Sequence, residues 1–128
     1  METITQPTEQ KSISAQEMAQ ELEQKYQSIM PGTKIEFWQI DRENDSINVF
    51  YKQPSRLQKM MFFDQMQTSQ NSLAAQNFLK SIIIPENHPD VLDAIEPNGR
   101  NENDILTFTM IMKANEMVSI YFNALKKK

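Results

Sequence analysis

The residues whose types are best suited to metal binding or acid-base chemistry lie between positions 86 and 93. They are Glu86, His88, Asp90 and Asp93. Carboxylates and imidazoles bind transition metals, but these four fall around two prolines and match no recognised ligand spacing. His88 is the only histidine and the chain has no cysteine, which excludes multi-histidine metal sites, thiolate ligands and cysteine nucleophiles. The pattern predicts a polar turn at His88 and no metal site.

The other carboxylates and the glycines carry no catalytic or cofactor signature. Asp41 and Asp45 flank a polar turn, whereas a calcium loop of the EF-hand type needs more oxygen ligands and a central glycine. Gly32 and Gly99 are far apart, so no glycine-rich loop can cradle a phosphate. The seventeen acidic residues single out no pair for general acid-base catalysis. We predict a protein that is not an enzyme and has no cofactor, with an enzyme of unfamiliar type as a minor alternative.

A short basic cluster raises the question of nucleic-acid binding. Lys52, Arg56 and Lys59 lie close to Phe50 and Tyr51, and cations beside aromatic rings are typical of single-strand-binding surfaces. Three cations are few, and the formal net charge of −4 disfavours non-specific attraction to nucleic acid or to an anionic membrane. No apolar run approaches the roughly 20 residues that span a bilayer, and the first thirty residues lack a basic start followed by a continuous apolar core. We expect a cytoplasmic protein with neither a nucleic-acid nor a membrane partner.

The nine methionines are more informative than the charges. Flexible thioether side chains adapt to irregular apolar surroundings, so they either fill a core or line a groove that accepts an amphipathic segment of a partner. Met60 and Met61 lie on a predicted helix that follows a predicted hairpin, and Trp38 and Phe50 are expected on the partly exposed face of that hairpin. We predict that these four residues bind a partner protein. A second packing layer is the alternative role for the two aromatic rings.

The first elements that must position this surface are a helix and a hairpin. Ser14 and Glu17 have capping-box spacing, and a Pro-Gly pair ends the helix that begins there. The segments KIEFWQI (34–40) and SINVFYK (46–52) are rich in β-branched and aromatic residues and enclose the polar segment DREND, which predicts an antiparallel hairpin. The face expected to pack on the helices carries Ile35, Phe37, Ile47, Val49 and Tyr51.

A helical body is predicted after the hairpin. Pro54 ends the strand, and Ser55 with Gln58 can cap the helix that follows. A break near residues 69–72 separates it from a second helix, which is followed by a proline-rich connector with a short helix and by a long final helix. The sequence thus predicts an α+β fold that is mostly helical, with an N-terminal helix, one antiparallel β-hairpin and a body of three or four helices.

The domain organisation follows from the length and the apolar pattern. Residues 1–12 are expected to form a flexible tail and residues 13–128 a single domain. The expected core contains Leu22, Tyr26, Phe37, Val49, Leu57, Phe78, Ile82, Phe108, Ile111 and Phe122. Two strands are marginal in water, so the hairpin must lean on helices or pair through its edge with another chain, which allows a homo-oligomer.

The joint between hairpin and helix resembles a feature of the small tail assembly chaperones of long-tailed bacteriophages. In that family a hairpin often ends in a tyrosine, a basic residue, any residue, proline, serine or threonine, and arginine before a helical body. The corresponding segment here is YKQPSR, residues 51–56. Downstream, AAQNFLKSIIIPENHPDVLDAI (74–95) is similar to the second helix and polar connector of the family. The resemblance covers residues 33–126, and the helix before it departs from the family pattern.

The resemblance implies a non-catalytic chaperone that acts in the host-cell cytoplasm during virion assembly. Such a chaperone binds apolar helical segments of the tape measure protein, shields them from aggregation and helps tail tube subunits assemble around it. Tape measure and tail tube proteins are the implied partners. The alternative is a structural virion component or a protein-protein interaction adaptor that uses the same hairpin as a permanent contact.

Overall fold

The computed structural model describes residues 14–68 and 71–126, and for Asn71 and residues 120–126 it describes the backbone alone. In chain order the elements are α2 (Ala15–Gln27), β1 (Ile35–Asp41), β2 (Ser46–Lys52), α3 (Arg56–Thr68), α4 (Asn71–Ile82), α5 (Pro89–Ala94), the short 3-10 helix η2 (Asn101–Asn103) and α6 (Asp104–Lys126). Five helices and one antiparallel hairpin in the described ranges confirm the predicted α+β fold with a body of four helices. The predicted tail lies outside the described residues.

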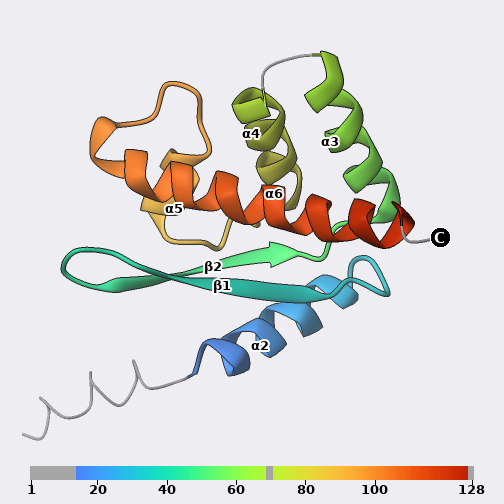
Figure 1. The fold of residues 1–128 in the computed structure, drawn as a ribbon. Helices are drawn as coiled ribbons and strands as arrows, with labels where there is room; N and C mark the ends of the chain where they lie inside the picture. Colours follow the sequence, from blue (N-terminus) through green and yellow to red (C-terminus); the bar gives the residue numbers. More distant parts are fainter. Residues whose placement is uncertain (1–13, 69–70, 127–128) are drawn as a thin grey trace, which may run out of the picture.

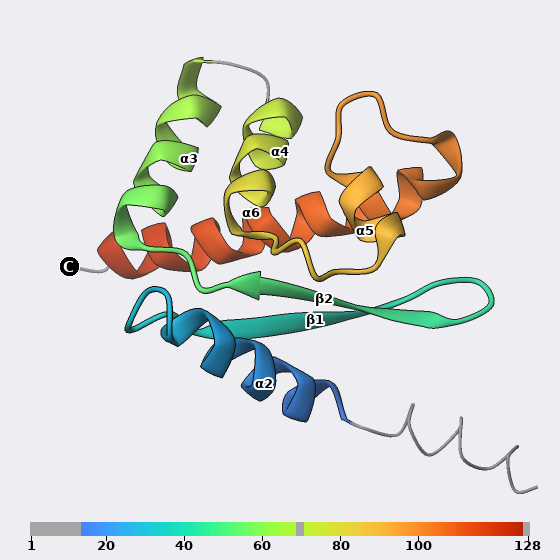
Figure 2. The same cartoon turned by 180° about the vertical axis from the view of Figure 1, so that it is seen from behind.

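The hairpin lies between two layers of helices. Figures 1 and 2 show α2 on one face of the strands and α3 to α6 on the other. The strand register places Phe37 opposite Phe50 and Trp38 opposite Val49. Because residues directly opposite one another in an antiparallel pair point to the same face, Phe37 and Phe50 face α2, whereas Trp38 and Val49 face the helical body.

The face assignment made from the sequence is therefore partly wrong. Ile47, Val49 and Tyr51 pack on the helical body as predicted, but Ile35 and Phe37 pack with α2. The strands alternate as expected, and the turn that joins Asp41 to Ser46 sets their relative register. A change of one residue in that register exchanges the faces of a strand, and the sequence does not state the register directly.

Two separate clusters of buried apolar side chains hold the layers together. The larger cluster joins the hairpin to the helical body, and its fully buried members include Val49, Phe62, Leu79, Ile82, Val91, Met110 and Val118. The smaller cluster joins α2 to the other face through Ala19, Ile35, Phe50 and Ile84. Since burial of apolar area is the main stabilising contribution, α2 is the less firmly held layer.

The structure confirms part of the predicted core and corrects the rest. Val49, Phe78 and Ile82 are buried. Partly buried are Leu22, Tyr26, Phe37 and Ile111. Leu57 and Phe108 are 65% and 60% exposed, so their assignment to the core is wrong. Leu57 lies about 140° around α3 from the buried Phe62, at 3.6 residues per turn. The side chain of Phe122 lies outside the described part of the structure.

On α6 the buried row is not the one that contains Phe108. Its members recur every four residues and are Leu106, Met110, Ala114 and Val118. Residues four apart share one face of a helix, and Phe108 projects from another face. The long apolar sequence of α6 thus supplies more apolar side chains than the core accepts.

The joint between β2 and α3 is built as predicted. The N–H of Ser55 donates to Gln58 Oε1 at 2.8 Å, and the N–H of Gln58 donates to Ser55 Oγ at 3.1 Å. This reciprocal cap satisfies two amides that a helix start leaves unpaired, directly after a strand-ending proline. Ser14 and Glu17 form the same arrangement at the start of α2. α3 ends at Thr68 and α4 begins at Asn71, which confirms the predicted break.

The outer edge of β2 is closed by the segment that follows α4. Asn87 Oδ1 accepts from the N–H of Phe50 at 2.8 Å, and Asn87 Nδ2 donates to the carbonyls of Phe50 at 2.7 Å and Ile84 at 2.8 Å. Ile83 adds an antiparallel bridge to Tyr51. The Asn87 side chain is only 6% exposed. Because its amide both accepts from and donates to the backbone of Phe50, it takes the place of a neighbouring strand at this position.

Polar contacts of the same segment anchor α2. Tyr26 Oη donates to Glu86 Oε1 at 2.6 Å, and Lys25 pairs with the other carboxylate oxygen. Burial opposes ionisation of Glu86, but the hydrogen bonds from Lys25 and Tyr26 outweigh it and hold the pKa of this carboxyl below its ordinary value. Burial and the hydrogen bond to Glu86 raise the pKa of Tyr26 to about 12, so its hydroxyl remains a donor at neutral pH.

The Glu86 anchor predicts a pH-dependent contribution to stability. A carboxyl whose pKa is lowered by folding stabilises the fold above its unfolded pKa of about 4.3, and this contribution disappears as the pH falls through the lower folded value. Glu86→Gln should therefore lower Tm at pH 7, by the equivalent of about 1 kcal/mol or less, and its difference from the parent protein should shrink as the pH falls below about 4.3. Thermal melts of both proteins from pH 3 to 7 check this; a constant difference across the range would contradict it.

Candidate protein-binding site

The structure separates the four residues that were predicted to bind a partner. Phe50 is 6% exposed and packs against Phe37 beneath α2, with ring centroids 5.8 Å apart. Trp38 is half-buried and packs against the larger core. Its ring centroid lies 4.4 Å from that of Tyr51. The expected exposure of Phe50 is wrong, because α2 covers the face on which it lies. Packing between layers, the alternative role, describes both rings.

Met60 and Met61 lie on an exposed apolar strip of α3. They are 45% and 53% exposed, and Leu57, one turn earlier, is 65% exposed. Spacings of three and four residues place these side chains next to one another on the helix. We call Leu57, Met60 and Met61 the α3 surface. Unlike the aromatic rings of the hairpin, all three offer apolar area to a partner.

A small hollow of about 100 Å³ between α3 and α4 borders this surface. Its lining consists of Gln58, Met61, Phe62, Gln65, Asn77, Phe78 and Ser81. Phe62 and Phe78 form its apolar part, stacked with ring centroids 4.7 Å apart. A water molecule takes up about 30 Å³, so the hollow has room for the tip of one apolar side chain. Its uncharged lining favours an apolar occupant over an ionised one.

A second exposed apolar strip lies on the first half of α6. Ile105, Phe108 and Met112 are 77%, 60% and 64% exposed, with spacings of three and four residues. We call these three residues the α6 surface. Sequence reasoning missed it, because Phe108 was assigned to the core. The signal that could have revealed it is the excess of apolar residues on α6 over those that one buried face can hold.

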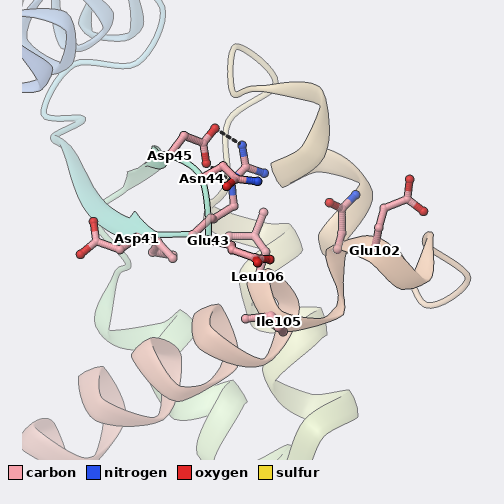
Figure 3. Close-up of a pocket in the computed structure, with 10 residues that line it drawn as sticks. Asp41, Glu43, Asn44, Asp45, Glu102, Ile105 and Leu106 are labelled. Carbon is pink, nitrogen blue, oxygen red and sulfur yellow. Dashed lines mark hydrogen bonds and ion pairs between the residues drawn. The ribbon is translucent and has the colours of Figure 1, made fainter.

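The α6 surface borders a larger hollow of about 340 Å³ beneath the hairpin turn. Figure 3 shows acidic side chains of the turn on one side and Glu102 and Ile105 on the other. Its lining consists of Ile40, Asp41, Arg42, Glu43, Asn44, Asp45, Glu102, Asn103, Ile105 and Leu106. Four carboxylates and one cation make this lining strongly acidic.

Two carboxylates already hold the cation of this hollow. Arg42 donates two hydrogen bonds of 2.8 Å to Asp45 and one of 2.9 Å to Asp90. The hydrogen bonds from Arg42 lower the pKa of Asp45. Within the described ranges, Asp41 and Glu43 have no ion-pair partner. The hollow therefore presents uncompensated negative charge beside exposed apolar side chains.

The described residues contain neither a candidate metal site nor a helix that could span a membrane. None of their histidine and carboxylate side chains form a group of three or more that could hold a metal ion. His88 instead caps α5, where its Nδ1 accepts from the N–H of Asp90 at 3.0 Å. No helix in these ranges is long and apolar enough to cross a membrane.

Comparisons with protein-family models, curated proteins and solved structures give no match to this chain.

Proposed function

We propose that this protein is a non-catalytic chaperone that binds apolar helical segments of a partner on the α3 surface. The observation that carries the proposal is the exposure of Leu57, Met60 and Met61 beside an uncharged hollow. Contact with a partner helix would remove this apolar area from water, which favours association by about 25 cal/mol per Å² before the costs of binding are subtracted. Methionine side chains adapt to different apolar sequences, as a chaperone requires.

The partner that we propose is the tape measure protein of a long-tailed phage, with tail assembly in the host-cell cytoplasm as the process. The resemblance of YKQPSR to the joint of the tail assembly chaperones supports this assignment. In the fold, that segment ends β2, turns the chain and caps α3 through Ser55. The family-like segment thus directly positions the helix that carries the proposed binding surface.

A second candidate is a structural virion component or adaptor that pairs through the hairpin, including pairing with a second copy. It is favoured by the outer edge of β1. The N–H and C=O of Phe50 both bond to Asn87. Phe50 therefore forms no hydrogen bond with Phe37, the residue opposite it on β1. In such a pair the N–H and C=O of Phe37 point away from β2, toward the outer edge of the hairpin. No described residue bonds these groups of Phe37, and an added strand would satisfy them. Stoichiometric presence in finished particles would favour this candidate, whereas release from them favours a chaperone.

Replacing both methionines of the α3 surface tests the proposed function. Met60→Gln/Met61→Gln should weaken capture of a co-expressed tape measure fragment at least about tenfold, because two adaptable apolar contacts are lost. Circular dichroism and Tm should change little, since both side chains are exposed. Pull-down yields and thermal melts measure the two effects.

The matched control is Met18→Gln/Met30→Gln, which changes two exposed methionines on and after α2. It should leave capture unchanged. Equal loss of capture in both double variants, or unfolding of the Met60→Gln/Met61→Gln protein, would show that the α3 surface is not the binding site.

A further inference from the structure

The α6 surface forms an apolar ridge between two hollows. Ile105 borders the acidic hollow of about 340 Å³ beneath the hairpin turn. Phe108 and Ile111 border another hollow of about 210 Å³ on the side of α4 and the connector after α5. Helices pack by fitting the ridges of one into the grooves of another, so a ridge between two hollows suits the packing of a second helix.

The surroundings of the ridge are acidic and largely uncompensated. Four carboxylates without an ion-pair partner in the described chain lie around it: Asp41, Glu43, Glu102 and Asp104. The two arginines beside them, Arg42 and Arg100, are both paired with Asp90. An occupant with lysine or arginine side chains would therefore meet free negative charge, whereas an acidic occupant would be repelled.

We propose that the α6 surface and its acidic hollow bind a cationic amphipathic helix of a partner protein. The apolar residues of that helix would lie on Ile105, Phe108 and Met112, and its lysines or arginines would reach Glu43 and Glu102. Apolar contact would supply most of the affinity, and the charges would supply orientation and preference. The proposal goes beyond the α3 surface, whose hollow is uncharged.

The two surfaces lie toward opposite ends of α6. Figures 1 and 2 show the hairpin turn by the N-terminal half of α6, whereas α3 lies by its C-terminal half. Two different segments of a partner, one apolar and one cationic, can therefore be bound at separate places.

A second copy of the chain fits this site less well than a cationic helix. A second copy carries the same formal net charge of −4 and the same carboxylates, so it would bring negative charge to an acidic site. Like charges at facing positions are destabilising. The charge pattern thus selects an occupant of opposite sign.

The test uses the full chain and a fluorescein-labelled peptide of about 18 residues made of leucine and lysine, with leucines spaced for one helical face. Fluorescence anisotropy gives the Kd at low and at physiological salt. Phe108→Ser and the pair Glu43→Gln/Glu102→Gln should each weaken binding at least about tenfold at low salt. The paired variant should also reduce the salt dependence of Kd, because fewer charges are screened.

Two matched variants distinguish this site from general acidity and from general apolar exposure. Glu21→Gln/Asp64→Asn removes the same charge at exposed positions elsewhere, and Met18→Gln/Met30→Gln removes two exposed apolar side chains on and after α2. Both should bind the peptide like the parent protein. Met112→Ser serves as a second ridge variant if Phe108→Ser lowers Tm.

Several results would overturn the proposal. They are equal binding of a matched leucine-glutamate peptide, equal loss in the Glu21→Gln/Asp64→Asn control, and undiminished binding by the ridge variants. A dimer in sedimentation equilibrium that the ridge variants abolish would also overturn it, because the occupant would then be a second copy.

Discussion

Phe78→Ala is expected to lower the free energy of unfolding by about 3–5 kcal/mol. Phe78 is 4% exposed, and its ring stacks on that of Phe62 between α3 and α4. Truncation removes apolar contacts from the larger core and leaves a cavity that helices on both sides cannot fully close. Because small domains have a total stability of about 5–15 kcal/mol, the variant should be close to unfolding at growth temperature. Urea denaturation measures the change.

Phe108→Ala is the matched control for this prediction. It deletes the same atoms from a side chain that is 60% exposed, so its effect on stability should stay within about 0.5 kcal/mol. Similar losses at Phe78 and Phe108 would contradict the burial that the structure assigns to them. The same comparison tests whether the Phe108 side chain lies on the surface and not in the core.

Asn87→Ala is expected to cost about 2–4 kcal/mol, although it removes only a small polar side chain. The amide of Asn87 satisfies the N–H and C=O of Phe50 and the C=O of Ile84, and it is nearly fully buried. Its removal leaves buried backbone groups without partners, and each such group carries a desolvation cost. Chemical denaturation should show the loss, and amide exchange at Phe50 should accelerate.

Two further substitutions sharpen the Asn87 prediction. Asn98→Ala changes an exposed asparagine and should be almost neutral. Asn87→Asp keeps an acceptor for the N–H of Phe50 but loses both donors and buries a charge, so it should be at least as destabilising as alanine at neutral pH. A neutral outcome for either Asn87 variant would contradict the role assigned to this side chain.

Sequence reasoning succeeded where the signal is local. The capping pairs of Ser14 with Glu17 and of Ser55 with Gln58 depend on residues three apart, and both are present in the structure. The hairpin follows from two β-rich segments around a polar turn. Neither feature needs information from distant parts of the chain, so local spacing was sufficient.

The faces of the elements could not be predicted, because tertiary packing decides them. Trp38 faces the helical body because it lies opposite Val49 in the strand register. One residue more or fewer in the turn would shift this register and turn Trp38 to the other face. Phe50 is buried because α2 covers the second face of the hairpin, a contact between segments far apart in sequence. The acidic hollow likewise brings the turn at residues 41–45 against the start of α6, which no local pattern indicates.

Affinity purification from producing cells, followed by mass spectrometry, tests the proposed chaperone function most directly. The parent protein and the Met60→Gln/Met61→Gln variant would be purified in parallel, with Met18→Gln/Met30→Gln as the control. We predict that the parent and control proteins recover a long helical tape measure protein and that the α3 variant loses it while remaining folded. Recovery of the same proteins by all three, or of a capsid or nucleic-acid partner in place of the tape measure protein, would contradict this function.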